Sequence, residues 1–181
     1  MEQTIDAVRA VLQRFQDGYT ARDVTKLDEF MRLFAPDEDI ELIGIGAAKR
    51  AATEWFIGQP AIRDIVEGDW TYWGDVTLDI AGAQIHVRGE VAWLTTTGAL
   101  TRTQAFDKAL PQYLQQMKAL LENAEFDPDT QLMEATHFGM RRLRERSKGI
   151  GYSWPFTFVA VLIRSDGAWR FHTIHWSVPV D

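Results

Sequence analysis

Apolar residues recur every three to four positions at the start of the chain, which is the spacing of an amphipathic helix. The run over residues 5–19 alternates with Asp and Arg and predicts the first helix. Asp23 is a typical N-cap residue and precedes a second apolar stripe over Val24–Phe34, which Pro36 ends. The chain therefore begins with two predicted helices.

The periodicity then changes twice. Residues 40–46 alternate weakly and predict a short strand, whereas residues 47–57 and 60–67 have helical patterns. Strict alternation follows over residues 75–80 and, after a turn, over residues 85–100. The second of these strands is long, and we expect it to bend through a bulge.

The clearest signal is a hairpin close to the end of the sequence. Two alternating segments, Tyr152–Arg164 and Ala168–Val178, flank the turn residues Ser165-Asp166-Gly167. Three helices followed by antiparallel strands predict an α+β fold, with the N-terminal helices packed in a curved antiparallel sheet. The length of 181 residues fits a single domain, residues 1–181.

One segment, residues 104–150, interrupts the strands with a helical composition. Asp127-Pro128-Asp129 divides it into two helices, and Pro111 fits a first helical turn, so we predict an inserted helical hairpin. Its second helix ends in a cluster of basic residues. We interpret that cluster as a solvated face that suits the negative end of a helix, and its alternative is a site for an anionic ligand or partner. The cluster consists of Arg141, Arg142, Arg144, Arg146 and Lys148.

Composition narrows the possible partners. The net charge of −7 and a pI near 5.1 disfavour nucleic acid and anionic membranes. The chain has no cysteine, no long apolar run and charged residues throughout its first eighteen positions. A cytoplasmic protein without a membrane partner is therefore expected. No motif of a cofactor site is present, and the histidines lack metal-site spacing, so we expect neither cofactor nor metal.

Several short motifs together resemble the nuclear transport factor 2 superfamily, which has a cone-shaped, cystatin-like fold and includes SnoaL-like domains. Trp169 is followed by a His six residues later, at 175, and then by Ser177, as in the final strand of SnoaL-like domains. The matching segments are Arg22-Asp23, Leu27–Phe34, Gly58–Arg63, Asp166–Phe171 and His175–Ser177. The resemblance implies a bent sheet around a conical pocket and a homodimer formed through the outer face of the sheet.

Ketosteroid isomerase belongs to the same superfamily. It moves a proton with a carboxylate base and stabilises the enolate with a tyrosine and a second, protonated acid. Aligning the motifs places Phe15, Ile43 and Val159 at the positions of its tyrosine, base and second acid. All three are apolar, so this chain lacks that set. The resemblance favours His175 as the remaining acid or base candidate, and the alternative is a buried structural histidine. His86 could polarise a carbonyl beside Arg88, or it could belong to an exposed strand face.

These observations leave two main hypotheses. The first is a domain that binds a small, largely apolar molecule in the conical pocket, as a binding protein or as a cofactor-free enzyme of the cyclase, dehydratase or isomerase type. The second is a non-catalytic module for oligomerisation or protein interaction. A third, with a polypeptide partner at the basic helix end, carries less support. The expected ligand-binding residues are Phe15, Tyr19, Trp55, His86, Trp93 and His175.

Overall fold

The computed structural model describes residues 2–47, 49–51 and 54–178. Its first elements are the helix α1 (Glu2–Ala21), a short turn of 3-10 helix, η1 (Val24–Lys26), and the helix α2 (Leu27–Met31). The Asp23 side chain accepts a hydrogen bond from the backbone N–H of Thr25, which confirms the predicted cap. The two predicted N-terminal helices are therefore present.

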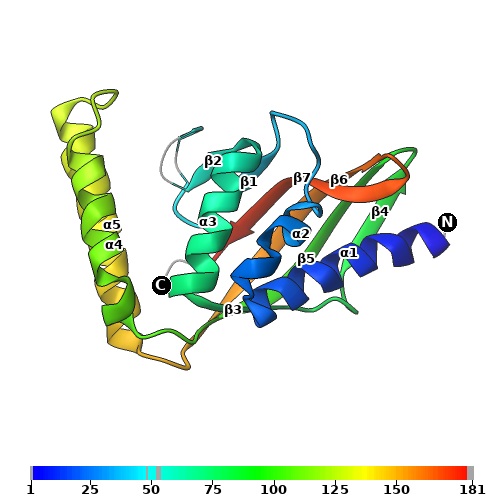
Figure 1. Ribbon diagram of the computed structural model, residues 1–181, viewed down its shortest axis with the longest axis horizontal. Coiled ribbons are helices and arrows are strands. Elements are labelled where there is room, and N and C mark those ends of the chain that lie inside the picture. The colour runs from blue at the N-terminus through cyan, green and yellow to red at the C-terminus, as the bar shows by residue number, and fades with distance from the viewer. Residues whose placement is uncertain (1, 48, 52–53, 179–181) are drawn as a thin grey trace.

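Seven strands form one sheet against which these helices pack (Figure 1). The strand order is β2-β1-β7-β6-β5-β3, and β4 pairs with β5 beside its N-terminal half. All pairs are antiparallel except β1 with β7, which is parallel. The strands are β1 (Glu41–Ile43), β2 (Trp55–Ile57), β3 (Gly74–Leu78), β4 (Gln84–Arg88), β5 (Val91–Arg102), β6 (Ser153–Ser165) and β7 (Ala168–Ser177).

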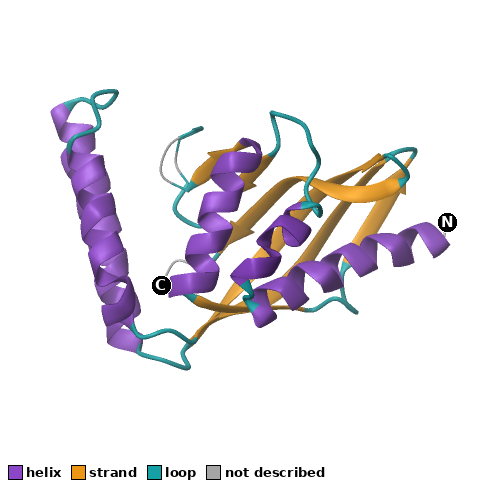
Figure 2. Ribbon diagram, viewed as in Figure 1, coloured by secondary structure: helices purple, strands orange, loops and turns teal. Residues whose placement is uncertain are grey.

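The observed class is α+β, as predicted, with helices on one face of a curved sheet (Figure 2). The terminal hairpin is confirmed: β6 and β7 are joined by a turn at Asp166 and Gly167, both with positive φ. Two local predictions are wrong. Residues 55–57 form the strand β2 and not part of a helix, and the long strand predicted over residues 85–100 is a hairpin of β4 and β5 that turns at Gly89.

A bulge in β7 changes which side chains face the core. Leu162 pairs with Phe171 but Val161 pairs with Thr173, so His172 is an extra residue on β7. Because side chains alternate along a strand, one extra residue reverses the side on which all later residues lie. The buried residues of β7 are Trp169 and Phe171 before the bulge, and Ile174 and Trp176 after it.

The concave side of the sheet holds an aromatic core centred on Phe15 of α1, which is 0% exposed. Rings from the helices and from the terminal hairpin surround it at centroid distances of 5.0–6.2 Å. This part of the cone is therefore filled by side chains. The surrounding rings are Tyr19, Phe30, Phe158, Phe171 and Trp176.

The helix α3 (Gly58–Tyr72) follows β2 directly and packs against α2 and the edge of the sheet. It begins at Gly58, whose φ of +78° is a conformation that glycine adopts readily. Its buried residues Ile62, Val66 and Trp70 recur every four positions and turn one face towards the core. That face carries the helix residues that line the site described below.

A helical hairpin joins β5 to β6 and stands beside α3 (Figure 1). It consists of α4 (Phe106–Leu121) and α5 (Pro128–Lys148), which confirms the two helices predicted for this segment. Asp127 caps α5 by accepting hydrogen bonds from the N–H groups of Asp129 and Thr130. Pro111 lies inside α4, not in its first turn as predicted.

Candidate functional site

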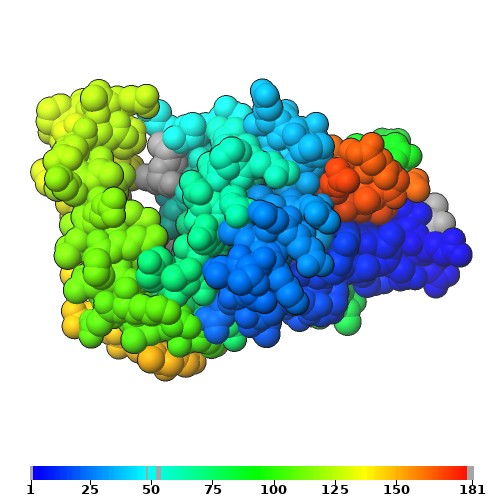
Figure 3. Space-filling model, viewed as in Figure 1, coloured from blue at the N-terminus to red at the C-terminus, as the bar shows by residue number. Residues whose placement is uncertain are grey.

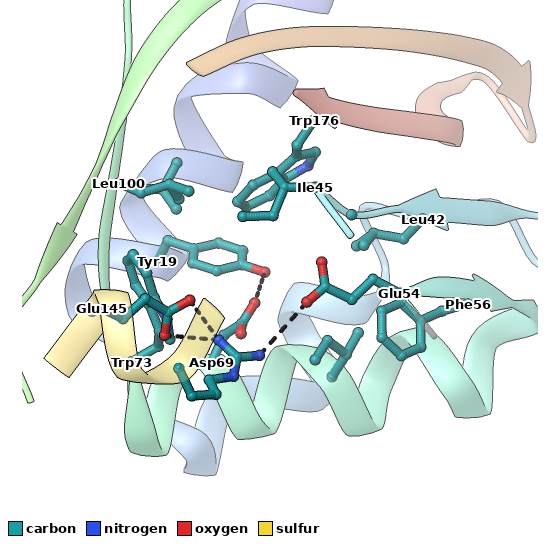
Figure 4. Close-up of a pocket in the computed structure, with 15 residues that line it drawn as sticks. Tyr19, Leu42, Ile45, Glu54, Phe56, Asp69, Trp73, Leu100, Glu145 and Trp176 are labelled. Atoms are coloured by element: carbon teal, nitrogen blue, oxygen red, sulfur yellow. Dashed lines mark hydrogen bonds and ion pairs between the residues drawn. The ribbon is translucent and has the colours of Figure 1, made fainter. Parts of the chain in front are cut away.

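A cavity of about 100 Å³ lies between the concave face of the sheet, the ends of α1 and α3, and the helix α5 (Figure 4). Most of its wall is apolar. An engineered apolar cavity of about 150 Å³ binds benzene, so this volume suits a molecule the size of one small ring. The apolar lining residues are Leu42, Ile45, Phe56, Ile65, Trp73, Val76, Leu100 and Trp176.

Two polar side chains meet inside this apolar wall. The hydroxyl group of Tyr19, from the last turns of α1, donates a hydrogen bond of 3.2 Å to Oδ2 of Asp69. Asp69 lies on the last turn of α3, three and seven residues after Val66 and Ile62, so it shares the apolar face of that helix. Figure 4 shows both side chains pointing into the cavity.

Burial raises the pKa of the Asp69 carboxyl group from its ordinary value to about 7. The carboxylate of Glu54 adds to this increase, whereas the hydrogen bond from Tyr19 and the positive charge of Arg142 oppose it. Burial, together with the nearby Asp69, also raises the pKa of Tyr19 well above its ordinary value. At neutral pH, Tyr19 is therefore a hydrogen-bond donor, and Asp69 exists in both protonation states.

A group of ion pairs closes the cavity on the side of the helical hairpin. Nη1 of Arg142 donates hydrogen bonds of 2.7 and 2.8 Å to the two carboxylate oxygens of Glu145. Its Nη2 lies 3.6 Å from Oε1 of Glu54, which is also paired with Arg141. Figure 4 shows Glu54 and Glu145 on two sides of the cavity, and the guanidinium group of Arg142 joins them.

Two arginines of the basic cluster on α5 do not belong to a solvated face, contrary to the interpretation from the sequence. Arg142 has 14% of its side chain exposed and is held between the rings of Tyr113 and Phe138 at 4.7 and 4.8 Å. Arg141 packs against Gly46, where a Cβ atom would collide with its guanidinium group. These two arginines connect the hairpin to the body of the protein, while Arg144, Arg146 and Lys148 remain exposed.

A larger groove, about 520 Å³, lies outside these ion pairs, between the hairpin and the body. Figure 3 shows the hollow between the two. The groove shares Glu54, Phe56 and Arg142 with the inner cavity, and Gln116 and His137 line its hairpin side. The pairing of Glu54 with the arginines therefore separates the inner cavity from the groove.

The six expected ligand-binding residues are not brought together. Tyr19 lines the cavity and Phe15 is buried in the core beside it. Trp55 lies on β2, where its neighbours Glu54 and Phe56 line the cavity in its place. His86 and Trp93 stack on each other on the outer face of the sheet, with ring centroids 5.5 Å apart.

His175 also lies on the outer face, contrary to the prediction that it points into the cone. The residue is exposed, and its neighbour Trp176 lines the cavity. The physical reason is the bulge at His172, which reverses the alternation that sequence reasoning extended from Trp169. Val159, aligned with an acid of ketosteroid isomerase, is likewise on the outer face and is 40% exposed.

Sequence reasoning did not identify Asp69, Glu54 or Glu145 as site residues. One signal was available for Asp69, because a carboxylate on the apolar stripe of a helix is unusual. Glu54 had no such signal, since its partner Arg141 is 87 residues away. Glu145 lies three residues after Arg142, which is the spacing of an ordinary ion pair on a helix surface and does not indicate burial. Only the folded chain brings these groups to one cavity.

The described residues contain neither a metal-binding cluster nor a helix that could cross a membrane. No group of three or more His, Asp or Glu side chains is placed to hold a metal ion among these residues. The helices described here include none with the length and hydropathy needed to cross a bilayer.

A helix-filled, curved sheet with a cavity at its open end defines a nuclear transport factor 2-like protein. The model of the SnoaL-like domain family matches residues 8–118, so the chain belongs to that family. The superfamily resemblance and the fold class predicted from the sequence are thereby confirmed. A search of curated proteins finds no match by sequence.

Solved structures of several bacterial proteins share this fold. A "putative dehydratase from the NTF2-like family" from Streptomyces avermitilis has a TM-score of 0.62 and 10% identity, with 99% of each chain covered. A nuclear transport factor 2-like superfamily protein from Salmonella enterica has a TM-score of 0.61 and 14% identity, covering 100% of this chain and 95% of its own. A "putative calcium/calmodulin dependent protein kinase II association domain" from Xanthomonas campestris has a TM-score of 0.57 and 12% identity, covering 96% and 80%.

Proposed function

We propose that this SnoaL-like domain binds a small, largely apolar molecule in the inner cavity and moves a proton on it by means of Asp69. One observation carries the proposal: a hydrogen-bonded Tyr19–Asp69 pair faces an otherwise apolar cavity, and the Asp69 pKa is raised to about 7. Proton transfer is most efficient when the pKa of the group lies near the working pH. Asp69 meets that condition.

Each side chain has a role in this proposal. Ionised Asp69 takes a proton from the bound molecule and returns it, as the neutral acid, to another of its atoms. Tyr19 holds the carboxyl group by its 3.2 Å hydrogen bond and keeps its orientation fixed. The apolar wall, with Trp73 and Trp176, excludes water from the reacting atoms.

Such a proton transfer serves dehydration, isomerisation or cyclisation, because each removes a proton from carbon and delivers one elsewhere. The resemblance to the Streptomyces avermitilis structure, whose name includes dehydratase, supports the reaction class at the level of a shared fold. The cavity volume favours a substrate portion about the size of a six-membered ring with one oxygen atom near Asp69.

The test uses 2-cyclohexen-1-one, a six-membered ring with one carbonyl group, dissolved in D₂O with the protein. Exchange of the hydrogens beside the carbonyl for deuterium is followed by proton NMR at neutral pD. We expect the wild-type protein to accelerate the exchange and Asp69→Asn to lower the protein-dependent rate by about 100-fold or more. Tyr19→Phe should lose about tenfold, because one hydrogen bond is removed.

The matched control is Asp64→Asn, which removes the same charge from an exposed position on the same helix. It should exchange deuterium at the wild-type rate. Equal rates for Asp69→Asn and wild type, or a wild-type rate no greater than that of buffer, would count against proton transfer by Asp69.

The outer face of the sheet favours a second candidate function, assembly. Val91, Trp93 and Val159 are each 40–43% exposed and lie on the same face of the adjacent strands β5 and β6. We propose that this face forms the homodimer that the superfamily resemblance implies. The name of the Xanthomonas campestris structure, an association domain, supports an assembly role through the shared fold.

Light scattering checks this second candidate. Val159→Glu places a charge on the exposed apolar face and should lower the molar mass, whereas Gln3→Glu, at an exposed position of α1 on the opposite side of the sheet, should leave it unchanged. A Val159→Glu protein with the wild-type mass would exclude this face as the interface. A protein that assembles but does not accelerate deuterium exchange would be a module whose function is association alone.

A further inference from the structure

Among the described residues, the helical hairpin carries more of the strongly exposed large apolar side chains than any other part of the fold. Large apolar side chains on α4 and α5 are 46–63% exposed, although the ordinary surface of a soluble protein exposes such residues singly. We define the outer stripe as these six residues: Leu114, Leu121, Leu132, Met133, Met140 and Leu143.

The spacing of the outer stripe places it on one face of each helix. Leu114 and Leu121 are seven residues apart on α4, and Met133 and Met140 are seven apart on α5, which is about two helical turns. The residues that line the groove towards the body, such as Gln116 on α4 and Arg141 on α5, project in other directions. The outer stripe therefore faces away from the body of the protein.

The stripe is large enough for a specific contact. A helix rises 1.5 Å per residue, so the 16 residues of α4 and the 21 residues of α5 extend about 24 and 31 Å. Two adjacent helices present a face roughly 20 Å wide, or about 500 Å². Pairing two such faces buries about 1,000 Å², which is about the minimum area of a biological interface.

Charge is distributed unevenly along the hairpin. The tip, where α4 meets α5, is acidic, and the end that joins the sheet is basic and exposed. This arrangement complements a second hairpin that runs in the opposite direction, because each acidic tip then meets a basic end. The tip carries Glu122, Glu125, Asp127 and Asp129, and the basic end carries Arg144, Arg146 and Lys148.

We infer that the outer stripe binds a second copy of this chain, with the two hairpins packed antiparallel as a four-helix bundle. A two-fold axis across the helices brings α5 of one copy onto α5 of the other. Pairing of the acidic tip with the basic end places this axis near the exposed Thr136, since Asp129 and Arg144 are seven and eight residues from it on either side. Met133 of one copy therefore faces Met140 of the other.

A membrane is the less suitable partner for this surface. The acidic tip and the net charge of −7 oppose the approach of an anionic lipid surface. The outer stripe is also separate from the face of the sheet that carries Trp93 and Val159. The two contacts can therefore form independently, and both together would join four copies.

Engineered cysteines test the antiparallel contact, because the natural chain contains no cysteine. We expect Thr136→Cys to form an intermolecular disulfide with itself under mild oxidation, seen as a dimer band on a non-reducing gel. Met133→Cys and Met140→Cys should form few such disulfides separately and many when the two proteins are mixed. Strong self-linking of either of these two proteins alone, or no linking of Thr136→Cys, would overturn the arrangement.

A second measurement does not depend on disulfide geometry. The double substitution Leu114→Glu and Met140→Glu should halve the molar mass from light scattering, with an unchanged circular dichroism spectrum. The control is Gln115→Glu, an exposed position beside the stripe, which should keep the wild-type mass. A double variant that keeps the wild-type mass would show that the stripe is not the interface.

Discussion

Replacing Glu145 by Gln is expected to lower the free energy of unfolding by about 3–5 kcal/mol, the usual effect of breaking a buried ion pair from one side. Glu145 is 6% exposed and lies 3.7 Å from Nη1 of Arg102, besides its two hydrogen bonds with Arg142. Arg102 is only 1% exposed. The substitution leaves both guanidinium groups buried without this carboxylate.

Urea denaturation followed by circular dichroism measures this effect. Glu122→Gln provides the control, since Glu122 has 65% of its side chain exposed and forms a surface ion pair with Lys118 of the same helix. Surface pairs contribute about 0–1 kcal/mol, so the control should unfold close to the wild-type midpoint. A loss below about 1 kcal/mol for Glu145→Gln would mean that the two arginines find other partners or water.

Replacing Asp69 by Asn is expected to stabilise the protein at pH 8 and to change it little at pH 4. The carboxyl group titrates with a pKa of about 7 in the folded chain and near its ordinary 3.8 when unfolded. Its contribution to stability is therefore complete below pH 4 and is lost as the pH rises through 7. Asn cannot ionise, so the variant avoids that loss, which is on the order of 4 kcal/mol.

The measurement is the difference in unfolding free energy between the variant and wild type at several pH values. Asp64→Asn on the same helix should give a difference that does not change across this range, because Asp64 is exposed. If Asp69→Asn is instead less stable than wild type at pH 8, Asp69 is an ordinary ionised partner of Arg142. An ionisable side chain that destabilises the fold at neutral pH is typical of a catalytic site.

The two experiments on Asp69 separate structure from function. The stability difference reports only the burial of the carboxyl group, whereas deuterium exchange requires that a ligand reach it. Raised stability at pH 8 without exchange activity would support a binding cavity with no proton transfer. Asp69→Asn could instead abolish deuterium exchange while its stability difference from wild type stays the same at pH 4 and pH 8. Asp69 would then act through its position and not through a raised pKa.

Several features of this protein could be predicted from the sequence because their signals are local. Helical spacing over residues 5–19 and alternation on both sides of Asp166-Gly167 depend on neighbours within a few positions. The division of the hairpin at Asp127 is equally local, since a cap bonds within its own first turn. The same signals, in order, supported the family resemblance.

The candidate site depended on contacts that local patterns do not contain. The Tyr19–Asp69 hydrogen bond joins residues 50 positions apart, and Arg141 and Glu54 are 87 apart. His175 shows how much one extra residue in a strand can change. The bulge at His172 leaves β7 a strand, as predicted, but moves the His175 side chain to the opposite face of the sheet. Sequence periodicity thus determined the fold of this chain, and the tertiary structure alone decided which side chains meet in the cavity, because long-range packing sets register and proximity.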